Sequence, residues 1–130
     1  MNKAGILIVE DEPITAKSVK TMLENLGYSV IDILSSGEEV LDKIGLLNPD
    51  IIIMDITLAG NISGIETAAH INSCHRIPII YLTANTNYDV IQKAKEETKS
   101  YGYLLKPVKG MDLHWTINTA LKRHQLEKDS

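Results

Sequence analysis

The chain has 130 residues and a mass of 14.4 kDa, enough for one domain with its own hydrophobic core and no cross-links. Its formal net charge of −4 gives no electrostatic reason to bind nucleic acid or an anionic membrane, and no apolar run is long enough to span a bilayer. Residues 1–4 lead into an apolar segment rather than a signal peptide, and Cys74 is the single cysteine. We therefore expect a cytoplasmic domain without disulfides.

The first half of the chain alternates segments typical of strands and of helices. Residues 5–9 are entirely apolar, and three acids at positions 10–12 follow them. Residues 13–26 begin with a proline, which fits the first turn of a helix, and repeat apolar side chains at roughly helical spacing before Gly27. Residues 28–34 are rich in β-branched side chains. The pattern predicts a strand, a helix and a second strand, in that order.

A capping box predicts the start of each of the next two helices. Ser36 is followed three residues later by Glu39, and the same spacing recurs at Ser63 and Glu66. In this pattern the two side chains satisfy free backbone N–H groups of the first helical turn. Between these helices, residues 51–55 form an unbroken apolar run that ends in one aspartate. Such a run is typical of a strand buried on both faces of a parallel sheet.

The second half of the chain repeats the alternation. Residues 78–82 and residues 101–105 are two further apolar runs. The interval between them is polar and predicts a weaker helix, whereas residues 111–126 predict a final helix. Strands that alternate with helices without a linker indicate a parallel sheet with helices on both faces. We therefore expect a single α/β domain over residues 1–130, flavodoxin-like and doubly wound, with five strands in the order 2-1-3-4-5.

Carboxylates follow the first and third of these strands. The two strands are neighbours in the expected order, which brings Glu10, Asp11 and Asp55 to one edge of the sheet. Gathering like charges is costly, so the pattern indicates a divalent cation, and all-oxygen ligation suits Mg²⁺ or Mn²⁺. We expect Asp11 and Asp55 to ligate directly and Glu10 to act through water. The backbone carbonyl of Thr57 would add a neutral oxygen.

A hydroxyl and an ammonium end two further strands at the same edge. Thr83 follows the fourth apolar run and Lys106 follows the fifth. Their common target is a phosphoryl group, because transfer of that group requires its oxygens to be neutralised by metal, lysine and hydroxyl donors. The chain has no P-loop and no nucleotide fingerprint. The nucleophile is therefore best taken as Asp55, which would form an acyl phosphate.

Four motifs together resemble the receiver domains of two-component response regulators. They cover nearly the whole chain and are, in order, Ile8-Val9-Glu10-Asp11-Glu12, Ile52-Ile53-Met54-Asp55-Ile56, Leu82-Thr83-Ala84 and Leu105-Lys106-Pro107. The resemblance implies that a histidine kinase phosphorylates Asp55, with Mg²⁺ bound by the three acids, and that the domain catalyses only its own phosphorylation and dephosphorylation. It implies that Lys106 pairs with the phosphoryl oxygens or with Asp55, and that Thr83 moves to hydrogen-bond the phosphoryl group.

The resemblance also assigns roles outside the acid cluster. Tyr103 matches the aromatic residue whose rotamer follows Thr83, and the peptide bond from Lys106 to Pro107 is expected to be cis. Tyr81 is interpreted as a packing residue.

One departure from the family's pattern lies in the loop after the phosphoacceptor strand. Ala59 stands where family members commonly have proline, and residues 60–64 are one residue longer than usual. Thr57 and Asn85 flank the expected path of the hydrolytic water. We regard these two residues as candidates for setting the lifetime of the phosphoryl group.

The partners implied by the resemblance are proteins. A histidine kinase or phosphotransfer protein would donate the phosphoryl group, and a downstream effector protein or a fused output domain would read the signal. The surface that changes would be the fourth helix, the last strand and the last helix, a face that also allows a homodimer. Residues 119–128 resemble the helix that continues into a further module in multidomain sensors. The chain is thus a stand-alone receiver, the amino-terminal part of a longer signalling protein, or a module of a hybrid sensor kinase.

Two other classes of protein fit parts of the pattern. A haloacid-type phosphatase or phosphotransferase also uses an aspartate nucleophile and Mg²⁺, but it needs a second acid where this chain has Thr57, and a cap domain. A binding module that never receives phosphate would not need the complete set of acids, hydroxyl and lysine. Taken singly, Asp11 is explained as a helix cap and Lys106 as a solvated strand end. The functional inference therefore depends on their joint placement.

Overall fold

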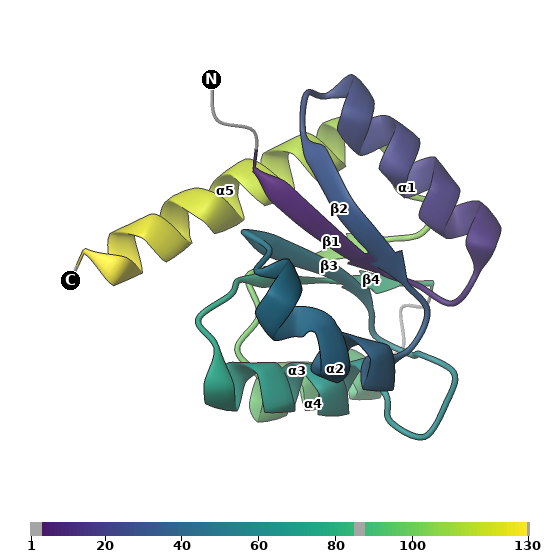
Figure 1. Cartoon of the computed structure of the whole chain (residues 1–130), viewed down its shortest axis with the longest axis vertical. Helices are drawn as coiled ribbons and strands as arrows, with labels where there is room; N and C mark the ends of the chain where they lie inside the picture. Colours follow the sequence, from purple (N-terminus) through teal and green to yellow (C-terminus); the bar gives the residue numbers. More distant parts are fainter. Residues whose placement is uncertain (1–3, 85–87, 130) are drawn as a thin grey trace.

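A computed structural model of the protein describes residues 4–84 and 88–129. None of the helices in these residues combines the length and the apolarity that crossing a bilayer requires. Five strands alternate with five helices in this part of the chain (Figure 1). In chain order they are β1 (Gly5–Val9), α1 (Pro13–Asn25), β2 (Ser29–Leu34), α2 (Gly37–Leu47), β3 (Ile51–Asp55), α3 (Gly64–Cys74), β4 (Ile79–Thr83), α4 (Tyr88–Glu97), β5 (Gly102–Leu105) and α5 (Gly110–Lys128).

The strands form one parallel sheet in the order β2-β1-β3-β4-β5, which confirms the predicted topology. Every residue of β3 is buried, as the unbroken apolar run predicts. In the register of the sheet, Val9 of β1 pairs with Met54 of β3, and Asp55 pairs with Leu82 of β4. The residues that end these strands therefore lie along the same edge.

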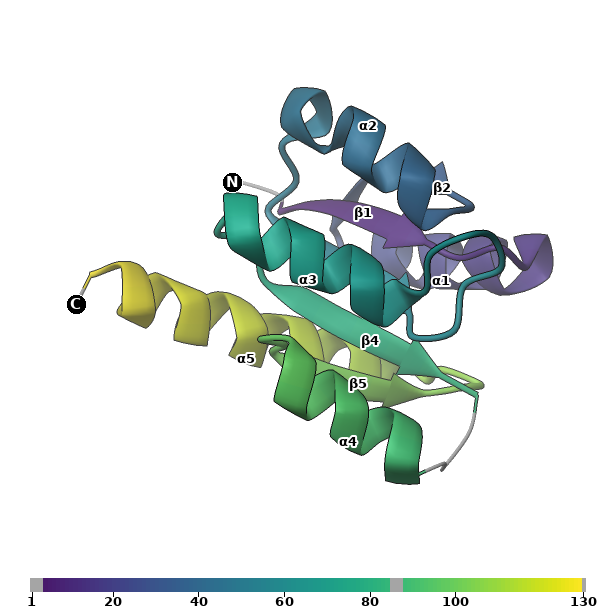
Figure 2. The same cartoon turned by 90° about the horizontal axis from the view of Figure 1, so that it is seen from below.

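Two apolar layers hold the helices on the sheet. Helices α1 and α5 cover one face, and α2, α3 and α4 cover the other (Figures 1 and 2). Successive side chains of a strand point to opposite faces, so alternate residues of β3 belong to different layers. Ile51 and Ile53 pack with α1 and α5, whereas Ile52 and Met54 pack with α2 and α3. Helix α4 is the most thinly attached of the five, with Ala94 as its single buried residue.

The caps of α2 and α3 differ, although the sequence predicts a capping box at both. At α3 the box is complete, with Ser63 and Glu66 each accepting from the other's backbone N–H. At α2 only half of it forms: the Ser36 hydroxyl accepts from the Glu39 N–H at 3.2 Å, but the Glu39 carboxylate binds the backbone and hydroxyl of Ser35 at 3.2 and 2.7 Å. Ser35 offers the carboxylate two donors where a capping box offers one, which explains the difference.

Helix α3 begins very close to the end of β3. A Cβ atom on Gly64 would lie 2.1 Å from the carbonyl oxygen of Asp55 and 3.0 Å from that of Ile56. Both of these atoms belong to the backbone and cannot turn aside. The absence of a side chain at position 64 is therefore what lets α3 approach the strand that carries Asp55.

We predict that Gly64→Ala lowers the free energy of unfolding by about 2 kcal/mol or more, because the added methyl overpacks a backbone contact. The matched control is Gly45→Ala within α2, where a Cβ atom would meet nothing within 4 Å. That change should raise the free energy of unfolding by about 0.5–1 kcal/mol, as alanine for glycine does inside a helix. Urea denaturation of the two variants measures both effects. Equal stability of the two would contradict the close approach.

Candidate functional site

Three carboxylates meet at the carboxyl edge of the sheet. Glu10 and Asp11 directly follow β1, and Asp55 is the last residue of β3, the strand that pairs with β1. One carboxylate oxygen from each residue lies within 4.8 Å of the other two. Glu10 and Asp55 are buried, whereas Asp11 is exposed. The cluster therefore has a buried pair of acids and an open side at Asp11.

A single lysine side chain joins the two buried acids. Lys106 follows β5, and its Nζ donates to Asp55 Oδ2 at 2.9 Å and also to Glu10 Oε1. Its backbone N–H donates to the carbonyl of Thr83 at 2.8 Å, which fixes the start of the side chain next to β4. The Lys106–Pro107 peptide bond is cis. The ammonium group of Lys106 thus links the end of β5 to the ends of β1 and β3, although β4 lies between β3 and β5 in the sheet.

Burial and these contacts divide the charge unequally between the two acids. Burial raises the pKa of Glu10 to about 7, and the neighbouring Asp55 adds to the rise while Lys106 opposes it. Burial also pushes the pKa of Asp55 upward, but hydrogen bonds from Glu10, Lys106 and the Thr57 N–H outweigh it, so this pKa lies below its ordinary value. For Lys106, burial lowers the pKa, and the bonds to the two acids more than restore it. Asp55 is therefore ionised at neutral pH beside a charged lysine.

The cluster also fits a divalent cation. Glu10 Oε2 is buried and has no hydrogen-bond partner in the part of the chain that the structure describes. A buried carboxylate oxygen without a donor is costly, and a cation would satisfy it. All the side-chain ligands on offer are oxygens, the donor type that Mg²⁺ and Mn²⁺ prefer. The residues present are thus suited to such an ion.

The loop after β3 supplies contacts that the sequence analysis did not include. The backbone N–H and the hydroxyl of Thr57 donate to Asp55 Oδ1 at 2.9 and 3.3 Å, and the Ala59 N–H donates to Asp11 Oδ2 at 3.3 Å. Loop residues carry no periodic pattern, so no signal in the sequence indicates these donors. The metal-ligand role of the Thr57 carbonyl stays a prediction. Asn85, the other candidate for phosphoryl lifetime, lies outside the described residues.

The two predicted switch residues lie on β4 and β5. Thr83 is the last residue of β4 and is buried, directly beyond the Leu82 that pairs with Asp55. Tyr103 is half-buried in β5, and its hydroxyl accepts from the Ser100 hydroxyl at 3.0 Å. The ion-paired group consists of Glu10, Asp55 and Lys106. Tyr103 is outside this group and lies within β5, three residues before Lys106.

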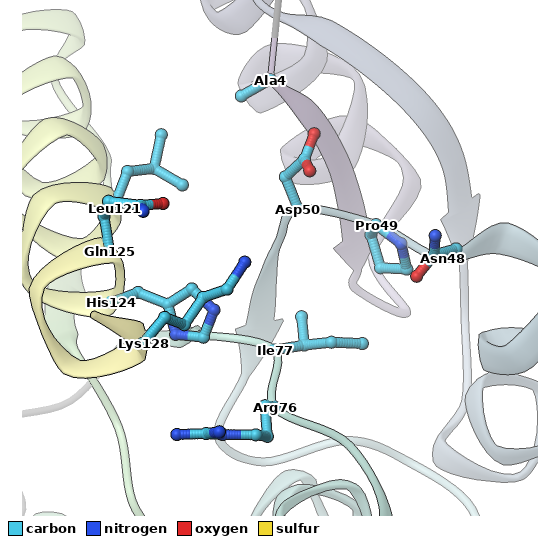
Figure 3. Close-up of a pocket in the computed structure, with 10 residues that line it drawn as sticks. All are labelled: Ala4, Asn48, Pro49, Asp50, Arg76, Ile77, Leu121, His124, Gln125 and Lys128. Atoms are coloured by element: carbon cyan, nitrogen blue, oxygen red, sulfur yellow. The ribbon is translucent and has the colours of Figure 1, made fainter. Parts of the chain in front are cut away.

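A cavity of about 500 Å³ lies at the opposite edge of the sheet, between the end of α5 and the loops that precede β1, β3 and β4 (Figure 3). Its cations, Arg76 and Lys128, lie near the carboxyl ends of α3 and α5, where a helix dipole favours positive charge, and burial lowers the pKa of the neighbouring His124. Its carboxylate, Asp50, accepts from the Gly5 N–H at 2.7 Å. These charges thus have a structural explanation, and the reactive groups are at the other edge.

Regulatory proteins from several bacteria resemble this chain. The family model described as the response regulator receiver domain matches residues 6–118. The transcriptional regulatory protein PdtaR of Mycobacterium tuberculosis is 32% identical over 118 residues, which are 91% of this chain and 57% of that protein. The positive alginate biosynthesis regulatory protein of Pseudomonas aeruginosa is 32% identical over 126 residues, 95% of this chain and 49% of that protein. The chain thus spans about half the length of these relatives.

Solved structures agree with the sequence relatives. The signal receiver domain of a modulated diguanylate cyclase from Desulfovibrio desulfuricans has a TM-score of 0.91 and 38% identity, with 97% of this chain and 99% of that chain covered. The amino-terminal domain of a response regulator/sensory box/GGDEF protein from Carboxydothermus hydrogenoformans has a TM-score of 0.86 and 34% identity, with 95% and 98% covered. With the family model matching most of the chain, the protein belongs to the receiver domain family of two-component response regulators.

Proposed function

We propose that this receiver domain takes up a phosphoryl group on Asp55 from a histidine kinase or a phosphotransfer protein. The observation that carries the proposal is the contact of the Asp55 carboxylate with Lys106 Nζ at 2.9 Å, inside a cluster of acid oxygens that lie within 4.8 Å of one another. A carboxylate held ionised beside a charged ammonium has both the nucleophile and the cation that phosphoryl transfer needs.

The transfer follows from the chemistry of these groups. A carboxylate oxygen of Asp55 attacks the phosphorus of a phosphorylated imidazole, so that an O–P bond forms as the P–N bond breaks. The imidazole leaves with the electron pair and takes up a proton. Lys106 and the hydroxyl of Thr83 neutralise the transferred oxygens. Mg²⁺ or Mn²⁺, held by Glu10, Asp11, Asp55 and the Thr57 carbonyl, would supply further positive charge to the same oxygens.

The signal would then leave the site through α4, β5 and α5. A phosphoryl group adds negative charge and acceptor oxygens at Asp55, which draw Thr83 and Lys106 toward it and shift the ring of Tyr103. Support comes from the thin attachment of α4, because elements with few buried contacts change position at low cost. A homodimer through the same face is part of this hypothesis.

The reader of the signal is either a separate effector protein or an output domain on the same chain. The relatives of which this chain spans about half are named regulatory proteins, one of them transcriptional, and the structural neighbours come from proteins described with diguanylate cyclase, sensory box and GGDEF modules. These descriptions support an arrangement in which a receiver controls a second module. The receiver itself acts on no external substrate in this hypothesis, and it catalyses only the gain and loss of its own phosphoryl group.

We predict that Asp55→Asn abolishes phosphorylation, because an amide cannot form the acyl phosphate. The wild-type protein, incubated with Mg²⁺ and acetyl phosphate, should gain a hydroxylamine-labile phosphate that intact-protein mass spectrometry detects. The matched control is Asp42→Asn, which removes an exposed carboxylate from α2 and should be labelled like the wild type. Labile phosphate on the Asp55→Asn protein would rule out this acceptor.

The pKa of Glu10 predicts how stability depends on pH. Because the folded-state pKa of about 7 lies above the ordinary value of 4.5, the folded protein binds this proton more tightly than the unfolded chain does. The metal-free protein should therefore lose stability as pH rises between these two values, and Mg²⁺, which needs ionised carboxylates, should stabilise it increasingly over the same interval. In Glu10→Gln both trends should weaken.

The measurement is urea denaturation at about pH 5 and about pH 8, with Mg²⁺ and with a chelator, of the wild type and of Glu10→Gln. The comparison between variants removes the contribution of other titrating groups. Glu24→Gln, at an exposed acid of α1, is the control and should behave like the wild type. A Mg²⁺ effect of equal size in Glu10→Gln at high pH would exclude Glu10 from the metal site.

A further inference from the structure

A buried tyrosine lies in the middle of β4, two residues before Thr83. Tyr81 is fully buried, and because side chains alternate along a strand it lies on the same face of β4 as Thr83. That face packs against α3 and α4. An apolar side chain would fill this position without a polar atom to satisfy, whereas a buried hydroxyl is costly unless it is hydrogen-bonded. The partner of the hydroxyl is therefore informative.

The hydroxyl of Tyr81 holds the end of α4. It lies 2.7 Å from the hydroxyl of Thr98, the residue that directly follows α4. Thr98 Oγ1 in turn donates to the carbonyl of Ala94 at 2.7 Å, so its hydrogen is used and Tyr81 is the donor between the two hydroxyls. Burial raises the pKa of Tyr81 to about 12, so the donor proton is retained. A relay of two hydrogen bonds thus runs from β4 to the last turn of α4.

The ring of Tyr81 supports Tyr103. The two residues pair directly across β4 and β5, and their rings stack with centroids 5.7 Å apart and an angle of 29°. From α4, Lys95 Nζ lies 5.6 Å from the centroid of the Tyr103 ring. The Tyr103 hydroxyl accepts from Ser100, as described above. Tyr81 therefore contacts the end of α4 and β5, two of the three elements through which the signal is proposed to leave.

We propose that Tyr81 is a positioning residue of the switch. Its hydroxyl fastens the carboxyl end of α4 to the strand that carries Thr83, and its ring sets the resting orientation of Tyr103. The inference rests on the proposed function, because it assumes that phosphorylation acts through Thr83. A displacement of the end of β4 then reaches α4 and Tyr103 through one side chain, which matters because Ala94 is the single buried residue of α4.

Amide hydrogen exchange of the unphosphorylated protein tests the contacts. Tyr81→Phe keeps the ring and removes the hydroxyl, so the Thr98 amide, which donates to Ala94 at the end of α4, should exchange roughly fivefold faster, as expected for the loss of one hydrogen bond. Thr98→Val should have at least this effect, and the double variant should exchange no faster than Thr98→Val alone. Additive effects, or no change in Tyr81→Phe, would overturn the role of the hydroxyl.

Two further variants complete the test in the free protein. Tyr28→Phe removes a tyrosine hydroxyl between α1 and β2 that lies 3.4 Å from His114 of α5, and it should leave α4 unchanged. Tyr81→Leu removes the ring, so the NMR signals of the Tyr103 ring should shift, whereas in Tyr81→Phe they should stay within the wild-type range. Unchanged Tyr103 signals in Tyr81→Leu would overturn the role of the ring.

Addition of Mg²⁺ and beryllium fluoride, which mimics an acyl phosphate, tests the coupling. In Tyr81→Phe the changes in amide chemical shift near Asp55 and Lys106 should equal those of the wild type. The changes at Ala94 and Thr98 should be at most half as large as in the wild type. If the changes in Tyr81→Phe equal those of the wild type at Ala94 and Thr98 as well as near Asp55, the inference is overturned. If the wild type shows no response near Asp55, the proposed function fails, whereas the exchange experiment still decides whether Tyr81 holds α4 and Tyr103.

Discussion

The interaction on which the site depends is the sharing of one ammonium group by two buried carboxylates. Lys106 bonds to both Glu10 and Asp55, and the third acid, Asp11, lies within 4.8 Å of them. Two buried acids beside one lysine leave an excess of negative charge in a place that water barely reaches, which is unfavourable for the fold alone. The fold tolerates this arrangement because a proton on Glu10 relieves part of the repulsion. A divalent cation would relieve it in the same way.

The parallel sheet explains how residues so distant in the chain meet. Glu10 and Lys106 are 96 positions apart, yet each directly follows a strand of the same sheet. Parallel strands end at a common edge, so the direction of the strands alone places any residue that follows a strand at that edge. The segments that follow the strands must also pack closely together. Gly64 permits this at the start of α3, because its lack of a side chain lets the helix approach the carbonyl of Asp55. Backbone packing therefore sets the distances that the side chains use.

The attachment of α4 differs in kind from that of the other helices. Helices α1, α3 and α5 are held by several buried apolar residues each, which pack in many small contacts. Helix α4 buries Ala94 and gains a hydrogen-bonded connection from Tyr81 to Thr98. Apolar packing is non-directional and adjusts in small steps, whereas a hydrogen bond depends steeply on geometry. An element held by little apolar packing and by directional bonds at one end, from Tyr81 to Thr98 and from the Lys99 N–H to Asn72 Oδ1, responds to small movements of its anchors, and this property suits a signalling surface.

The sequence by itself determined the class of fold, the strand order and the composition of the acid cluster. Unbroken apolar runs such as residues 51–54 indicate burial on both faces, and the residue after each run is then assigned to the functional edge. The tertiary structure alone decided that Lys106 bonds to Glu10 as well as to Asp55, that Glu39 turns to Ser35, and that Tyr81 is a donor to Thr98 rather than simple packing. Periodicity encodes which side chains are buried, because burial depends on the face of an element. Which polar groups meet depends on loop paths and on approach distances of a few ångströms, and no local pattern in the chain contains these.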